Sequence, residues 1–238
     1  MIPKTIHYCW FGRGPLPELA QKCIESWHKF MPDYEYKLWN EDNFDVNSIP
    51  YTKEAYEARK FAFVSDYVRL KALYEEGGLY MDTDVEVYKS FDDLMNLTAF
   101  AGYEGTKYHP VGTGVIASEK GGAWVKEQLD YYSDELHFIK SDGSFDLTTN
   151  VVTVSKRMKL NGFIANEKYQ VYNDLHIFPT DYFCPYQTTG ELLITENTYC
   201  NHHFSGSWND SPKSKAWYSF IGQKNITRLI KLKRKLFG

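Results

Sequence analysis

The N-terminal part of the chain alternates between short apolar runs and amphipathic stretches. Residues 4–12 (KTIHYCWFG) are rich in β-branched and aromatic side chains and predict a strand that ends at the following glycines. Residues 16–32 (LPELAQKCIESWHKFMP) place apolar side chains near helical spacing and stop at a proline, which predicts a helix. Residues 34–40 (YEYKLWN) alternate between apolar and polar positions as a second strand does. The order is therefore strand, helix, strand.

A longer amphipathic stretch and a further apolar run follow. Residues 54–76 predict one helix, and Gly77 and Gly78 supply the residues that commonly end a helix. Residues 79–88 (LYMDTDVEVY) then predict a strand with acidic residues at its C-terminal end. Ligands of open α/β sheets bind at that edge. We predict one α/β domain over residues 1–220, because no repeat or linker interrupts this order.

Composition agrees with a folded globular protein. Of the 238 residues, 43% are hydrophobic and 17% are aromatic, and this length suits one large domain. The first residues lead directly into a strand, and no window reaches the roughly 18 apolar residues that a membrane span needs. The four cysteines form no CxxC pair and indicate reduced thiols. We therefore expect a cytoplasmic protein.

The charge distribution sets the C-terminus apart. The net charge is −4, yet residues 224–238 hold six basic residues and no acid, so the remaining chain has 27 − 6 = 21 basic against 31 acidic residues. Residues 221–238 predict a basic amphipathic helix. Such a helix can lie on an anionic membrane surface, here the inner face of the cytoplasmic membrane, or pack against the body of the protein, and both remain open. Nucleic acid is disfavoured because the body is acidic.

The pair Asp82 and Asp84 is the strongest chemical signal. In an extended chain these side chains point to the same side, where two hard carboxylates suit Mg²⁺ or Mn²⁺ and leave positions for water and substrate phosphates. One alternative is a solvated acidic pair. Another is a phosphatase of the haloacid dehalogenase type, in which the first Asp is a covalent nucleophile. That motif usually starts the domain, whereas here it follows two strands and a helix.

Three blocks of sequence resemble one known family. Residues 2–12 (IPKTIHYCWFG), 65–84 (SDYVRLKALYEEGGLYMDTD) and 202–208 (HHFSGSW) resemble signature blocks of glycosyltransferase family 32, and the middle block also resembles the glucosyltransferase domains of large clostridial toxins. The resemblance implies a glycosyltransferase A-type, Rossmann-like nucleotide-sugar-binding fold with a mostly parallel central sheet. It also implies a metal-bound nucleotide diphosphate and retention of anomeric configuration.

The resemblance assigns roles to residues in the first two blocks and to Phe61, which lies just before the second. For the nucleotide, it implies that Trp10 stacks on the base, that Phe61 and Ser65 line the base and ribose pocket, and that Tyr80 makes a further contact. For the donor sugar, it implies contacts from Asp66 and Arg69. For the metal, it implies that Asp82 contacts both ribose and metal and that Asp84 binds metal. Asp66 and Arg69 share a helix face and offer acceptors and donors to sugar hydroxyls. The alternatives are an intrahelical ion pair for these two, and ordinary packing for Trp10 and Tyr80.

The third block supplies candidate residues near the end of the domain. We expect His203 to complete the metal shell, while Ser205, Ser207 and Trp208 close over the diphosphate. The toxins place an acid where His203 aligns, so the choice between His202 and His203 stays open. Surface histidines without a metal are the alternative, because imidazole is a less usual partner for hard cations.

Together these features predict a metal-dependent, retaining hexosyltransferase. The expected donor is a UDP-sugar, and the expected acceptor is a glycan or lipid-linked oligosaccharide in capsular or surface polysaccharide synthesis. The metal would offset charge on the leaving diphosphate. No carboxylate nucleophile is identified in the sequence. The resemblance implies front-face attack. We expect residues 104–118 and 141–155 to border the acceptor side. A catalytically silent sugar-nucleotide or glycan-binding module is the alternative function.

Overall fold

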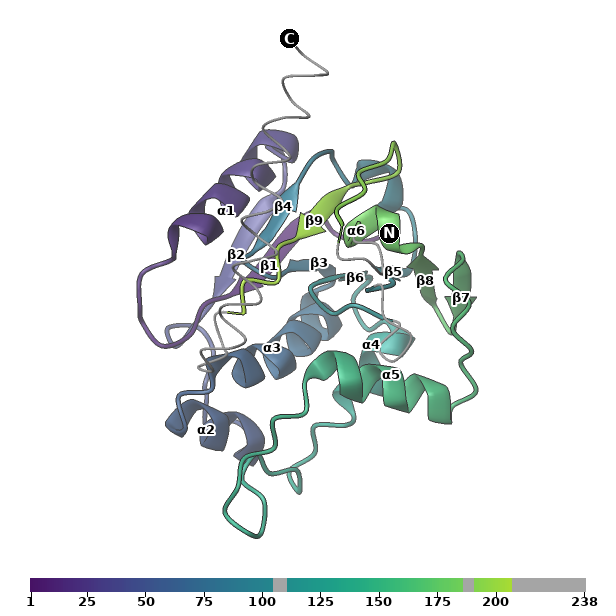
Figure 1. Cartoon of the computed structure of the whole chain (residues 1–238). Coiled ribbons are helices and arrows are strands. Elements are labelled where there is room, and N and C mark those ends of the chain that lie inside the picture. Colours follow the sequence, from purple (N-terminus) through teal and green to yellow (C-terminus); the bar gives the residue numbers. More distant parts are fainter. Residues whose placement is uncertain (105–110, 186–190, 207–238) are drawn as a thin grey trace.

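The computed structural model describes residues 1–104, 111–185 and 191–206, which form the predicted α/β fold (Figure 1). Its helices are α1 (Glu18–Phe30), α2 (Pro50–Glu57), α3 (Phe61–Glu76), α4 (Ala123–Leu129), α5 (Asn150–Leu160), α6 (Thr180–Phe183) and the 3₁₀ helix η1 (Asp92–Leu94). Its strands are β1 (Thr5–Cys9), β2 (Glu35–Trp39), β3 (Gly78–Met81), β4 (Val85–Val87), β5 (Ala99–Gly102), β6 (Val115–Ser118), β7 (Gln170–Tyr172), β8 (Leu175–Phe178) and β9 (Cys200–His202).

The central sheet has seven strands in the order β2-β1-β3-β6-β5-β8-β7. Strand β1 is parallel to β2 and β3, and β5 is parallel to β8. Strand β6 is antiparallel to both β3 and β5, and β7 is antiparallel to β8. Five strands therefore run in one direction and two in the other, which confirms the predicted mostly parallel sheet. A second sheet pairs β4 with β9 in antiparallel fashion.

Both faces of the central sheet are buried, because successive side chains of each strand point to opposite faces. In β3, Tyr80 belongs to the core under α2, α3, α4 and α5, whereas Leu79 and Met81 belong to the core under α1, α6 and the β4-β9 sheet (Figure 1). Strand β5 repeats the pattern with Phe100 on the second face. The edge after β3 is consequently held between two hydrophobic layers.

The two glycines before the acidic motif fix the path from α3 into β3. Gly77 ends α3 with a φ of 72°, in the left-handed region that favours glycine, and its N–H donates to the Leu73 carbonyl. Gly78 packs so tightly on β1 that an added Cβ would lie 2.6 Å from the Thr5 carbonyl oxygen. A larger residue at either position would displace β3 and the aspartates that follow it.

Two elements differ from the sequence prediction. The predicted helix over residues 54–76 is two helices, α2 and α3, because Arg59 adopts a φ of 58° that a helix cannot contain. The predicted strand over residues 79–88 is also two, since the chain turns after Met81 and β4 pairs with β9 instead of continuing the central sheet. The acidic motif therefore lies in a turn between two sheets.

Other sequence predictions have different outcomes. All four cysteines are free and buried, in agreement with the predicted thiols. Within the three described ranges, no helix has both the length and the apolar character that a bilayer crossing requires. The predicted helix over 221–238, the domain boundary after residue 220, Ser207 and Trp208 all lie outside the described residues.

Candidate metal centre

Asp82 and Asp84 converge, but a turn brings them together. The Val85 N–H donates to the Asp82 carbonyl at 3.0 Å, which closes a four-residue turn after β3. The Asp82 N–H donates to the Gly114 carbonyl at 2.9 Å and so ties the turn to the segment before β6. The extended strand predicted across Asp82 and Asp84 is therefore wrong, although the two carboxylates do share one side.

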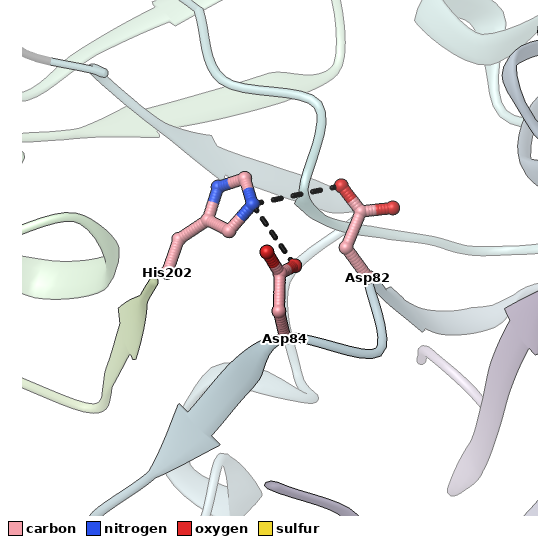
Figure 2. Close-up of side chains that lie close together, drawn as sticks. All are labelled: Asp82, Asp84 and His202. Carbon is pink, nitrogen blue, oxygen red and sulfur yellow. Dashed lines mark ion pairs between the residues drawn. The ribbon is translucent and has the colours of Figure 1, made fainter. Parts of the chain in front are cut away.

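Strand β9 brings a histidine to this turn. His202 pairs in register with Val85 of β4, next to the turn. Its Nε2 lies 3.2 Å from an oxygen of Asp84 and 3.9 Å from an oxygen of Asp82 (Figure 2). One ligand atom from each of these three residues lies within 4.8 Å of the others. Two carboxylates and one imidazole therefore face a common point.

The structure places His202, rather than the predicted His203, beside the two aspartates. The side chain of His203 leaves the cluster, and its Nε2 lies 3.0 Å from Glu86 Oε2. The main chain that follows still contacts the site, because the Ser205 N–H donates to Asp84 Oδ2 at 2.8 Å. Ser205 thus donates its backbone N–H to Asp84. The sequence had predicted that Ser205 closes over the diphosphate.

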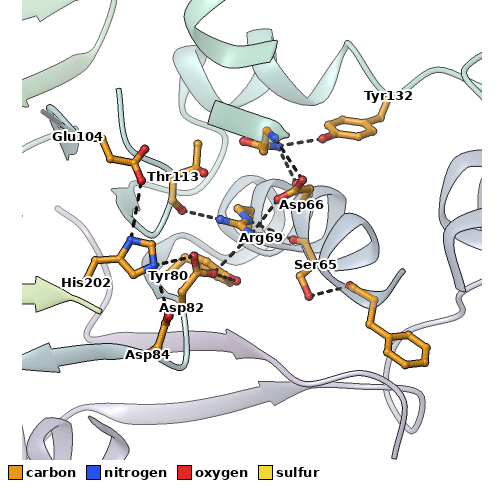
Figure 3. Close-up of polar contacts among 12 residues, drawn as sticks. Ser65, Asp66, Arg69, Tyr80, Asp82, Asp84, Glu104, Thr113, Tyr132 and His202 are labelled. Carbon is orange, nitrogen blue, oxygen red and sulfur yellow. Dashed lines mark hydrogen bonds and ion pairs between the residues drawn. The ribbon is translucent and has the colours of Figure 1, made fainter. Parts of the chain in front are cut away.

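Arg69 links the acidic turn to α3. Its guanidinium lies 2.9 Å from Asp66 Oδ1 and 3.4 Å from Asp82 Oδ1, and it donates to the Thr113 carbonyl at 2.7 Å (Figure 3). It also lies over the ring of Tyr80, whose hydroxyl donates to Asp82 Oδ1 at 2.8 Å. Arg69 is 5% exposed. Asp66 and Arg69 therefore form the ion pair that was the alternative to sugar binding, and Arg69 extends it to Asp82.

Asp66 is held from its other side by the start of α5. The Asn150 N–H donates to Asp66 Oδ2 at 3.2 Å, and the Asn150 side chain donates to the Tyr132 hydroxyl at 2.9 Å. Asn150 was not predicted as a site residue, although it lies within the predicted acceptor region 141–155. Its Oδ1 has no hydrogen-bond partner among the described residues and is buried.

The partly buried acid Glu104 is a site residue that was predicted from the sequence only as the start of the region 104–118. It comes two residues after β5, and its Oε1 lies 3.9 Å from His202 Nδ1 (Figure 3). Its side chain is 14% exposed. The signal that identifies it is similar to the one that identified Asp82, namely an acid within two residues of the end of a short buried strand. The site thus collects acids from the ends of both β3 and β5.

Charge at the site is strongly unbalanced. Burial raises the pKa of Glu104 to about 7 and that of Asp66 to about 6. Burial would also lower the pKa of His202, but Asp84, Asp82 and Glu104 raise it to about 9. The same His202 charge and the Ser205 amide hold the pKa of Asp84 well below its usual range, against the effect of burial. Four carboxyl groups therefore surround one guanidinium and one imidazole.

The donor set fits a divalent cation. Two carboxylates are the ligands that Mn²⁺ and Mg²⁺ prefer, a neutral imidazole is a less usual third ligand for such hard cations, and the excess of acidic groups gives a cation a favourable electrostatic environment. Asp82, Asp84 and His202 would hold the ion. An ion there would replace the proton that His202 carries in its absence, since a protonated imidazole has no free lone pair.

Among the predicted base-pocket residues, Ser65 contacts the cluster, because its carbonyl accepts from Arg69 Nε at 3.3 Å, whereas Trp10 and Phe61 lie by the loop after β1. Phe61 starts α3, and a Cβ added at Gly12 would lie 2.3 Å from its ring, so the loop after β1 packs directly on it. Trp10 is half-buried in that loop and its Nε1 donates to the Gly14 carbonyl at 2.7 Å. Ser65 donates back to the Phe61 carbonyl at 3.2 Å. Trp10, Phe61 and Ser65 thus border the C-terminal end of β1, beside α3.

Comparison with a protein-family model agrees with the sequence blocks. Residues 17–101 match the model described as "Glycosyltransferase sugar-binding region containing DXD motif". The match includes Asp66, Arg69 and both aspartates of the turn, and it excludes Trp10 and the C-terminal histidines. It confirms the predicted resemblance over the middle of the chain.

Individual relatives carry similar names. Inositol phosphoceramide mannosyltransferase 3 of Schizosaccharomyces pombe is 30% identical over 147 residues, which are 58% of this chain and 40% of that protein. The chain thus spans less than half the length of this relative. An uncharacterized glycosyltransferase of Acanthamoeba polyphaga mimivirus is 24% identical over 97% of this chain and 92% of its own. Among solved structures, the PaToxG glycosyltransferase shares 20% identity over 68% of this chain and 71% of its own, with a TM-score of 0.46.

Proposed function

We propose that this chain, whose residues 17–101 match the model of a glycosyltransferase sugar-binding region containing a DXD motif, is a metal-dependent, retaining hexosyltransferase of the A-type fold. The observation that carries the proposal is the convergence of Asp82, Asp84 and His202 within 4.8 Å, beside the buried Arg69. A nucleotide-diphosphate sugar is the donor, with a UDP-sugar as the first candidate. Glycan or lipid-linked oligosaccharide is the acceptor.

The chain's own groups supply binding and charge stabilisation. When bound, a divalent cation offsets the charge that develops on the diphosphate as the sugar leaves. Asp82, Asp84 and His202 would hold the cation at the end of β3, and Arg69 keeps Asp82 oriented through its ion pair. Tyr80 donates to the same carboxylate and limits its rotation further. Preorganised groups of this kind are effective because they need not reorganise during the reaction.

The donor side of the site extends from the turn toward Trp10 and Phe61. These aromatic side chains offer flat surfaces for a nucleotide base near the end of β1, and Asp66 is the acid closest to Arg69 on α3. Asp66 reaches sugar hydroxyls only if its pairing with Arg69 and Asn150 leaves a lone pair accessible. The names of the yeast relatives make mannose a second candidate sugar, so GDP-mannose belongs in any donor panel.

Donor hydrolysis tests this proposal. Wild-type protein is incubated with Mn²⁺ and a panel of UDP-hexoses, UDP-N-acetylhexosamines and GDP-mannose, and nucleotide release is measured with and without chelator. We expect release from one donor, its loss with chelator, and a loss of at least about 100-fold in Asp84→Asn, equal to about 2.7 kcal/mol. The matched control is Asp134→Asn, an exposed acid in the loop after α4. Product anomers measured by NMR test retention.

Two results would contradict the proposal. Absence of nucleotide release from every donor in the wild type favours the silent binding module. Release that is equal in Asp84→Asn and wild type contradicts the metal role of the turn. Binding of a donor without release, measured by calorimetry, separates a module that only binds sugar nucleotides from a protein that does not bind them.

We also propose that residues 224–238 attach the protein to an anionic membrane surface. Their six basic residues are the support, each contributing about 1 kcal/mol near such a surface, together with the ceramide lipid that appears in the name of the Schizosaccharomyces pombe relative. Co-sedimentation of the full chain with phosphatidylserine vesicles is compared with a full chain in which Lys231, Lys233, Arg234 and Lys235 are glutamine. Equal pelleting of the two contradicts membrane attachment.

A further inference from the structure

The two nitrogens of His202 face different acids. Its Nε2 faces Asp84 at 3.2 Å and Asp82 at 3.9 Å, while its Nδ1 faces Glu104 Oε1 at 3.9 Å (Figure 3). A neutral imidazole carries one proton, and it binds a cation only through the nitrogen that lacks it. A cation held with Asp82 and Asp84 therefore requires the tautomer with its proton on Nδ1. Glu104 lies where that proton would point.

We propose that Glu104 is a positioning residue that accepts the Nδ1–H of His202 and thereby presents Nε2 to a divalent cation at Asp82 and Asp84. This inference rests on the proposed metal-dependent function and deepens it. Carboxylates that orient ligating histidines in this way hold the ring and the tautomer, and their loss typically weakens metal binding about 10- to 100-fold. Glu104 would act through His202, without itself contacting the cation.

The surroundings of Glu104 hold it in this place. Gly112 donates its N–H to the Gly102 carbonyl at 2.9 Å, and this contact brings the two segments together on either side of the acid. A Cβ added at Gly112 would lie 3.4 Å from Glu104 Cβ, so the glycine packs closely on the side chain. The chain around Glu104 is thus built from β5 and from the segment before β6, both attached to the central sheet.

The imidazole is also confined from the side of Gly114. A Cβ added there would lie 2.8 Å from His202 Nδ1 and 3.1 Å from Asp82 Oδ2. The same glycine accepts the Asp82 N–H through its carbonyl. The ring therefore has Gly114 against its Nδ1 edge, the aspartates at Nε2, and Phe204 beside it at a centroid distance of 4.2 Å. Confinement fixes the plane of the ring, and Glu104 decides which nitrogen carries the proton.

Long-range charge is the competing explanation, and the chain offers a matched control for it. Glu86 is also an acid close to the turn, but it contacts His203 instead of His202. Glu86→Gln and Glu104→Gln each remove one negative charge and keep the shape of the side chain. If Glu104 contributed only negative charge, the two variants would weaken cation binding to a similar degree.

Cation binding and tautomer are measured on the full-length protein. Mn²⁺ binding, by calorimetry and by electron paramagnetic resonance, is expected to weaken about 10- to 100-fold in Glu104→Gln and less than about threefold in Glu86→Gln. With Mg²⁺, ¹⁵N NMR of histidine side chains should show His202 as the Nδ1–H tautomer, assigned by its absence in His202→Gln. At a Mg²⁺ concentration that saturates the wild type but leaves the weakened variant largely unbound, the Glu104→Gln spectrum should lose this single tautomer. The melting temperature without metal should not fall, because four carboxyl groups face one guanidinium and one imidazole there, so the variant removes an excess negative charge and keeps the side-chain shape.

The outcomes separate the inference from the proposed function. Mn²⁺ binding that is unchanged in Glu104→Gln, or equally weakened in Glu86→Gln, overturns the role of Glu104 and leaves the metal-dependent transferase standing. An Nε2–H tautomer in the Mg²⁺-bound wild type overturns that role even if Glu104→Gln fails to fold. Absence of Mn²⁺ binding to the wild type, with or without UDP, overturns the metal centre itself and the role of Glu104 with it.

Discussion

Cation binding should expel a proton from His202. In the absence of a cation, three acids raise the His202 pKa to about 9, so the imidazole is charged at neutral pH. A cation at Asp82 and Asp84 needs the neutral ring, because both charges would otherwise compete for the same carboxylates. The perturbation is therefore the addition of Mn²⁺, and the quantity measured is the number of protons released.

The magnitude follows from the pKa values at the site. At pH 8, about nine tenths of His202 is protonated, against about one tenth of Glu104, whose pKa is about 7. Mn²⁺ binding should thus release about one proton, nearly all of it from His202. Deprotonating the ring at this pH costs about 1.4 kcal/mol, and the apparent affinity should rise about fivefold between pH 8 and pH 9.

Calorimetry in buffers of different ionisation enthalpy measures the released protons directly. The observed binding enthalpy should vary with buffer enthalpy with a slope of about one at pH 8, and the slope should fall toward zero above pH 10. His202→Gln should abolish the slope, whereas His203→Gln should leave it intact, because His203 contacts Glu86 instead. A slope near zero in the wild type at pH 8 would contradict the predicted proton release, since such a slope means that His202 is already uncharged before the cation binds.

Three further predictions concern the same cluster. Arg69→Met should lower the free energy of unfolding in urea by about 3 to 5 kcal/mol, because it leaves Asp66 and Asp82 without their buried counter-charge; a loss below 1 kcal/mol would show that the pair is solvated. Asp82→Asn should lower the His202 pKa in the metal-free protein, since Asp82 raises it, and an NMR titration that finds it unchanged would contradict this. Gly114→Ala should weaken Mn²⁺ binding by pushing on the His202 ring, with no fall in proton release at pH 8; unchanged affinity would show that the loop yields.

Local sequence patterns were sufficient to predict the elements that lead to the site. The apolar run of β1, the amphipathic spacing of α1 and the alternation of β2 each depend on neighbours along the chain, and all three appear within a few residues of their predicted bounds. The glycines after α3 were informative for the same reason, because a positive φ at Gly77 is a local requirement.

What the sequence did not reveal depends on contacts between distant segments. The pairing of β4 with β9 joins residues more than 110 positions apart, and this pairing selects His202 over His203 for the cluster. Glu104 becomes a site residue only because β5 is separated from β3 by a single strand, β6, in the sheet order. The break at Arg59 was missed because helix periodicity continues across it on both sides.

The binding of a divalent cation by Asp82, Asp84 and His202 is tested most directly by the anomalous scattering of manganese in crystals of the wild-type protein grown with Mn²⁺ and UDP. The account predicts one manganese peak in the candidate centre, bound by oxygens of Asp82 and Asp84 and by Nε2 of His202, with a UDP phosphate oxygen completing the shell. UDP bound with no manganese between it and these three side chains would contradict the account.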